Sequence, residues 1–157
     1  MYISTQVTAN APDAIRKIVQ QTGVFSDIEV QTAGELAEEV LNGKDDSYLF
    51  QFAYDEQHKL LGYTCYGEIP MSPYRFDLYW IAVSPQSQGS GIAQLLLQCT
   101  HEHIAILGGK HVYAETSSTA HYNSARKFYI KQGYTEVARI PSFYKDNDDK
   151  VIYAYYI

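Results

Sequence analysis

The segment from Phe76 to Gly109 constrains the fold more than any other part of this 157-residue sequence. It opens with an apolar run, Phe76 to Val83, which is typical of a strand in the middle of a sheet. Pro85 ends this strand, a loop with two glycines follows, and apolar residues at helical spacing continue to Gly108 and Gly109. The segment therefore predicts a central strand that leads through a glycine loop into the N-terminus of a long helix.

Strand and helix patterns alternate along the rest of the chain. The second helix is expected to begin at Thr32, because Thr32 and Glu35 have the form of a capping box. The order β-α-α-β-β-β-α-β-α-β-β predicts the α/β (α+β) class, a mixed sheet with helices on its faces. We expect strands over residues 3–7, 48–52, 60–68, 76–83, 111–116, 134–140 and 151–157, helices at 12–22, 32–42, 92–107 and 122–132, and a turn at residues 146–149.

The composition fits one domain spanning residues 1–157. The 12 Lys and Arg residues against 18 Asp and Glu give a net charge of −6, which disfavours nucleic acid as a partner. No apolar run approaches the roughly 18 residues of a membrane span, and the N-terminus has no pattern of a secretion signal. Cys65 and Cys99 form no spacing motif. We expect a cytoplasmic protein without a membrane partner. The sequence does not decide between a monomer and a homodimer.

The glycine loop, residues 86–91, is typical of a site for phosphate or diphosphate. Glycines let backbone amides approach an anion, and the following helix N-terminus adds unpaired N–H groups. No Lys follows Gly91, which excludes a Walker A loop, and Gln94 excludes a dinucleotide fingerprint. The pattern that remains is Gln86-x-x-Gly89-x-Gly91. A plain strand–helix connection and a general nucleotide or phosphate binder are the alternatives.

This pattern resembles the acetyl-CoA signature of the GNAT superfamily of N-acetyltransferases. A second segment, Ala125 to Tyr134, resembles the family motif Ala-x-x-Phe/Leu-Tyr-x-x-x-Gly-Phe/Tyr. The expected order of elements is also similar to the GNAT fold. The resemblance implies a mostly antiparallel sheet that splays open, helices on both faces, and acetyl-CoA (coenzyme A) as co-substrate.

The resemblance also implies roles for individual residues. The diphosphate of CoA would lie on the loop amides and the pantetheine arm along the strand edge, where an amide near Ile81 would polarise the acetyl carbonyl. Tyr129 would protonate the departing thiolate, whereas its helical spacing alone fits a core aromatic. Asn123 lies one residue beyond the position where many relatives carry Asn, a turn of about 100° on a helix. The candidate cofactor-binding residues are Ile81, Ala82, Val83, Gln86, Gln88, Gly89, Ser90, Gly91, Ile92, Ala93 and Asn123.

Three carboxylates at strand positions are candidates for holding or deprotonating an amine. Asp77 would share a strand face with Tyr79, Ile81 and Val83 by the period of two. Glu115 and Glu68 lie at the ends of neighbouring strands. Solvated strand ends are the alternative interpretation. The histidines show no spacing typical of a metal site, and no metal is expected.

These features predict an acetyl-CoA-dependent N-acetyltransferase. The acceptor would be a primary amine of a small molecule or peptide, acetylated by direct transfer in a ternary complex. The carboxylates favour a cationic amine over an anionic acceptor. The alternative is a non-catalytic acyl-CoA-binding or sensing module, which would keep the glycine loop without needing Tyr129.

Overall fold

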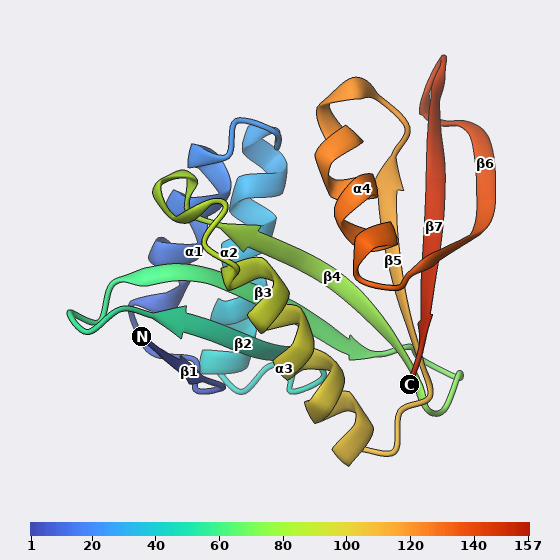
Figure 1. The fold of residues 1–157 in the computed structure, drawn as a ribbon. Coiled ribbons are helices and arrows are strands. Elements are labelled where there is room, and N and C mark those ends of the chain that lie inside the picture. Colours follow the sequence, from blue (N-terminus) through green and yellow to red (C-terminus); the bar gives the residue numbers. More distant parts are fainter.

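The structure is a computed structural model that describes residues 1–157. Seven strands form one sheet in the order β1-β2-β3-β4-β5-β7-β6, and only the β4–β5 pair is parallel (Figure 1). The strands are β1 (Tyr2–Ser4), β2 (Leu49–Tyr54), β3 (Leu60–Glu68), β4 (Arg75–Val83), β5 (His111–Ser117), β6 (Thr135–Lys145) and β7 (Asp148–Tyr156). The helices are α1 (Ala11–Gln21), α2 (Asp27–Leu41), α3 (Ile92–Ile106) and α4 (Asn123–Lys131). The predicted fold class and the central position of β4 are confirmed.

The helices cover the two faces of the sheet. α1 and α2 pack on one face of β2, β3 and β4, around a core that includes Phe50, Phe52 and Tyr63. α3 covers the opposite face of the same strands, and α4 packs beside β5 and β7 on that side (Figure 1). None of the helices is both long and apolar enough to cross a membrane.

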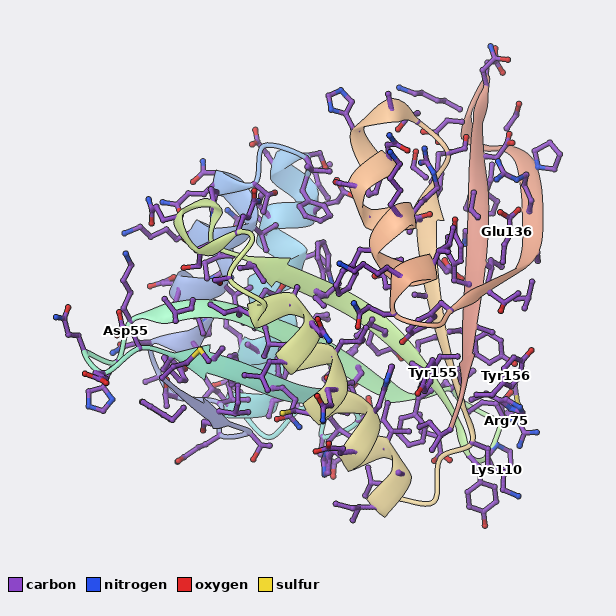
Figure 2. All side chains as sticks on the ribbon, viewed as in Figure 1. Asp55, Arg75, Lys110, Glu136, Tyr155 and Tyr156 are labelled. Atoms are coloured by element: carbon purple, nitrogen blue, oxygen red, sulfur yellow. The ribbon has the colours of Figure 1, made fainter.

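β4 and β5 diverge into a fork. Their parallel pairing runs from Arg75–His111 to Leu78–Ala114 and stops there, so the rest of β4 has no neighbour on that side (Figure 1). The closed end of the fork lies by the C-terminus, where Figure 2 places Arg75 and Lys110 near the end of β7. Main-chain groups of β4 beyond Leu78 are therefore left for a ligand at the open end.

A β-bulge lies where the fork opens. On the β3 side, Leu78 pairs with Tyr66 and Trp80 with Cys65, so Tyr79 is an extra residue in β4. A bulge inserts one residue and so shifts the alternation of side chains between the two faces.

This bulge separates side chains that strict alternation would place together. Asp77 lies on the α1–α2 face, where Trp80 packs against the core of that side. Leu78 and Ile81 both pack into the core under α3 and α4, and Val83 contacts the cluster of Ile92 on α3. The prediction that Asp77 shares a face with Ile81 and Val83 is therefore wrong.

Helix α2 begins five residues earlier than expected. Ser26 Oγ accepts the Glu29 N–H at 3.3 Å, and Glu29 Oε2 accepts the Ser26 N–H at 2.8 Å, a complete capping box. The predicted box at Thr32 and Glu35 lies inside the helix. Both segments have the same spacing, and Val30 on the buried face favours the earlier start.

The last hairpin is longer than expected. β6 passes through Pro141 to Lys145, because an edge strand tolerates a residue without an N–H group. The turn is reduced to Asp146 and Asn147, and Asp148 is the first residue of β7.

His101 links α3 to the C-terminal strands and should make stability depend on pH. Its Nε2 is 2.8 Å from the Tyr134 hydroxyl, its ring stacks on Tyr155 at 4.1 Å, and burial lowers its pKa to about 4. Since unfolded histidine has a pKa of about 6.5, the unfolded chain binds the proton first as the pH falls from that value towards 4. Stability is therefore lost as the pH falls through this window.

We expect His101→Gln to flatten this dependence by up to about 1.4 kcal/mol per pH unit. Urea unfolding of both proteins across the window measures the two slopes. Equal slopes would contradict this assignment of the buried neutral imidazole.

Candidate active site

The glycine loop has the geometry of an anion-binding site. Gly89 and Gly91 have φ angles of +76° and +82°, and a Cβ at either would meet no atom within 4 Å. Gly91 is the N-cap of α3, and the N–H groups of residues 89–94 donate no hydrogen bond within the chain. Six unpaired donors beside a helix N-terminus, on an open surface, suit a diphosphate.

The other loop side chains support this shape. Ser84 Oγ donates to Gln86 Oε1 at 3.3 Å, and Ser90 Oγ donates to the Ser87 carbonyl. The Gln86 side chain thus bonds within the loop, whereas Gln88 is exposed. The Ile92 side chain is buried against the sheet. Ile92 and Ala93 therefore contribute their unpaired backbone N–H groups to the anion site.

A cavity of ≈ 630 Å³ lies at the open end of the fork. We call it the fork cavity. It is bounded by β4, β5, the α1–α2 loop, the start of α4 and the β6–β7 hairpin. Its lining residues are Gly23, Val24, Phe25, Ser26, Glu29, Tyr79, Trp80, Ile81, Glu115, Thr116, Ser117, Thr119, His121, Tyr122, Ala125, Tyr129, Tyr144, Lys145 and Asp148.

The three strand residues expected to hold the pantetheine arm lie differently. Ile81 lines the fork cavity, next to the bulge. The Ala82 side chain is buried in the core on the α1–α2 face, and Val83 packs against α3. Ala82 and Val83 can therefore contact a cofactor through the backbone only.

Tyr129 reaches the fork cavity from the α3–α4 face. Its ring is buried, with centroids 5.2 Å from Tyr134 and 5.8 Å from Tyr153, and its hydroxyl makes no hydrogen bond within the chain. Burial raises the pKa of Tyr129, so the phenol is protonated at neutral pH. Tyr129 is therefore a buried aromatic residue of the core and also a hydrogen-bond donor that faces the cavity, so the two interpretations of its position in the sequence are compatible.

Two carboxylates meet on the opposite, α1–α2 face. Glu115 lines the fork cavity and forms an ion pair with Lys150, with Nζ and Oε2 2.7 Å apart. Asp77 is half-buried on the same face and does not line the cavity. Burial, followed by the charge of Glu115, raises the pKa of Asp77, while Lys150 opposes the shift. The third candidate, Glu68, accepts the Tyr74 N–H at 2.7 Å at the closed end of the fork and lies outside the cavity.

Other predicted or reactive side chains lie away from the fork cavity. Asn123 is exposed at the start of α4, and its neighbour Tyr122 lines the cavity instead. Cys65 is buried in the core and Cys99 lies on α3, and burial raises the pKa of both thiols. No group of three or more His, Cys, Asp or Glu side chains is placed to hold a metal ion.

Comparison with known proteins identifies the family. The acetyltransferase (GNAT) domain model matches residues 46–136, more than half of the chain. The chain belongs to the GNAT family of acetyltransferases. A protein from Desulfovibrio desulfuricans assigned to the same family has 35% sequence identity and a TM-score of 0.93, over 99% of this chain and 98% of that one. No match was found among curated protein sequences.

More distant GNAT structures share the fold. An aminoglycoside 6'-N-acetyltransferase complexed with coenzyme A has 18% identity and a TM-score of 0.78, over 99% of this chain and 97% of that one. The ribosomal-protein-S18-alanine N-acetyltransferase from Escherichia coli has 19% identity and a TM-score of 0.77, over 99% and 93%. The resemblance inferred from the two motifs is confirmed, and this GNAT chain is an acyltransferase.

Several cavity residues of this GNAT chain were not anticipated. Tyr144 and Lys145 belong to the extension of β6, and Asp148 lies in the predicted turn. Thr116 is buried and its Oγ1 has no hydrogen-bond partner, although it lines the fork cavity. The alternation of side chains along β5 beyond Glu115 could have indicated Thr116. No local pattern indicated Tyr144, Lys145 and Asp148, because their positions depend on where the hairpin folds.

Proposed function

We propose that this GNAT chain transfers an acetyl group from acetyl-CoA to a primary amine of a small molecule or peptide by direct transfer in a ternary complex. The observation that carries the proposal is that the candidate groups lie on opposite faces of the sheet at the fork. The glycine loop and Tyr129 lie on the α3–α4 face, and Asp77 and Glu115 lie on the α1–α2 face. Donor and acceptor can then approach from opposite faces and meet where β4 and β5 separate.

On the donor side, the residues present suit acetyl-CoA. The N–H groups of residues 89–94 would hold the diphosphate, and the unpaired edge of β4 near Ile81 would bind the pantetheine amides. Acetyl-CoA supplies an activated thioester. A β4 amide N–H would stabilise the negative charge that develops on the carbonyl oxygen, and the Tyr129 hydroxyl would donate to the departing sulfur.

On the acceptor side, the carboxylates would make the amine nucleophilic. An ammonium must lose a proton before its nitrogen can attack, and Asp77 has a raised pKa that makes it a better base than an exposed aspartate. Because a thiol with pKa near 8.5 is more acidic than the buried Tyr129 phenol, a lasting tyrosinate is unfavourable. The ammonium would give its first proton to Asp77. The second proton, which the nitrogen loses as the new C–N bond replaces the C–S bond, would restore the Tyr129 phenol after Tyr129 has protonated the sulfur.

The cysteines support direct transfer over an acetyl-enzyme. An acetylated cysteine intermediate needs a thiolate at the reaction site. Neither Cys65 nor Cys99 lines the fork cavity, and the pKa of each is raised by burial. Initial rates with both substrates varied should give intersecting lines in double-reciprocal plots, and parallel lines would oppose the proposal.

The role of the carboxylates is tested by Asp77→Asn and Glu115→Gln. We expect each to lower kcat/KM for the amine by about 100-fold, the lower end of the range for a lost base, while acetyl-CoA affinity is retained. Glu136→Gln is the matched control, because Glu136 pairs with Arg139 at 3.0 Å on β6 and lies outside the cavity (Figure 2). Full kcat/KM in both Asp77→Asn and Glu115→Gln would place the acceptor elsewhere.

A further inference from the structure

Asp148 is a buried carboxylate without a cation. Its side chain lines the fork cavity although the residue is only 7% exposed. Oδ1 accepts a hydrogen bond from Ser117 Oγ at 2.5 Å, whereas Oδ2 has no partner in the chain. The ion pairs of this protein involve other acids, and no Lys, Arg or His nitrogen lies within 4.0 Å of Asp148. Buried charges in proteins are normally paired, so this one points to a cationic ligand.

The surroundings of Asp148 suit an ammonium group. Glu29 lines the same part of the cavity and uses Oε2 to cap α2, which leaves Oε1 free. Burial, followed by Glu29, Tyr144 and Asp148, raises the pKa of Tyr122 to about 12. Burial, followed by the charges of Glu115, Asp148 and Glu29, raises the pKa of Tyr144. The two phenol rings thus lie beside the two acids, and aromatic faces attract a cation.

Asp148 is too far from Asp77 to bind the same nitrogen. Asp77 pairs with Tyr113 of β5, and Ser117, which donates to Asp148, lies four residues further along that strand, a rise of about 13 Å. β7 begins at the open end of the fork and ends by the C-terminus (Figure 1), and Asp148 is its first residue. Two acidic positions therefore lie along the fork. Asp77 and Glu115 lie near the bulge, where Glu115 lines the cavity, and Asp148 and Glu29 line the cavity near the hairpin.

We infer that Asp148 binds a second ammonium group of the acceptor, so that the preferred substrate is a long diamine rather than a monoamine. The inference rests on the proposed function, because the first nitrogen is the one acetylated at Asp77 and Glu115. Glu115 already has a cationic partner in Lys150, at 2.7 Å, whereas Asp148 has none within 4.0 Å. A charge-assisted hydrogen bond to a desolvated carboxylate supplies the selectivity.

The test compares octamethylenediamine with octylamine, which has the same chain and a single cation. Isothermal titration into the protein saturated with CoA measures binding without turnover. We expect the wild type to bind the diamine at least about 10-fold more tightly, the lower limit for a charged hydrogen bond. In Asp148→Asn, which keeps an acceptor for Ser117 Oγ, the ratio of the two affinities should fall to near one.

An unchanged ratio in Asp148→Asn, or no preference in the wild type, would overturn the inference. Glu29→Gln provides a second variant, because its amide oxygen can still cap α2, and we expect it to reduce the ratio partly. A ratio unaffected by Glu29→Gln and Asp148→Asn alike would show that the acids are structural. Failure of the proposed function looks different, since the diamine would bind with an Asp148-dependent preference and yet not be acetylated.

Discussion

Gly91→Asp is expected to abolish measurable acetyl-CoA binding, with a loss of affinity on the order of 100-fold or more. The new carboxylate would lie at the N-terminus of α3 and accept hydrogen bonds from the N–H groups that would otherwise bind the diphosphate. Its negative charge would also repel the diphosphate. Gly89→Asp should act in the same way. Isothermal titration with acetyl-CoA measures the effect.

The control for this pair separates charge from backbone strain. Any residue other than glycine at φ = +82° costs roughly 1–2 kcal/mol of folding stability. Gly43 follows α2 with φ = +63° and also has no atom within 4 Å of a Cβ, so Gly43→Asp carries similar strain far from the loop. We expect all three variants to fold, and Gly43→Asp to bind acetyl-CoA normally. Near-normal affinity in Gly91→Asp would remove the diphosphate from this loop.

Tyr129→Phe is expected to lower kcat by about 100-fold, within the range for loss of a general acid. The ring stays in the core between Phe128, Tyr134 and Tyr153, so the fold and acetyl-CoA affinity should be retained. Steady-state kinetics with a good amine acceptor measures the change. A fall in kcat without a change in acetyl-CoA binding is the signature of a group that acts on the departing sulfur.

Tyr153→Phe is the matched control for this variant. Tyr153 is as buried as Tyr129 and stacks on it, but it does not line the fork cavity. Its hydroxyl should therefore be dispensable for turnover. Equal kcat in Tyr129→Phe and the wild type would return Tyr129 to a purely packing role.

The parts of the site that the sequence predicted are local in the chain. The glycine loop joins β4 directly to α3, so Gly89, Gly91 and the helix N-terminus come together through consecutive residues. Tyr129 lies in a short helix with a recognisable motif, and its neighbours Ala125 and Phe128 fix its inward direction. The main strand and helix order followed from the same local patterns.

The parts that were missed depend on pairing between distant segments. The bulge at Tyr79 arises from the register between β3 and β4, and it moved Asp77 away from the face of Ile81. Asp148 looked like a turn residue, because only the folded hairpin shows that β7 already begins there and buries it. The capping box of α2 was misplaced for a related reason, since two segments have the same pattern and tertiary burial favours one.

Amine-dependent release of free thiol from acetyl-CoA tests the central claim most directly. The protein is incubated with acetyl-CoA and a panel of mono- and diamines, and the thiol and the acetylated amine are quantified together. The account predicts thiol release that requires the amine, with an equal amount of N-acetylated product. Binding of acetyl-CoA without amine-dependent thiol release would contradict it and would instead indicate an acyl-CoA-binding module.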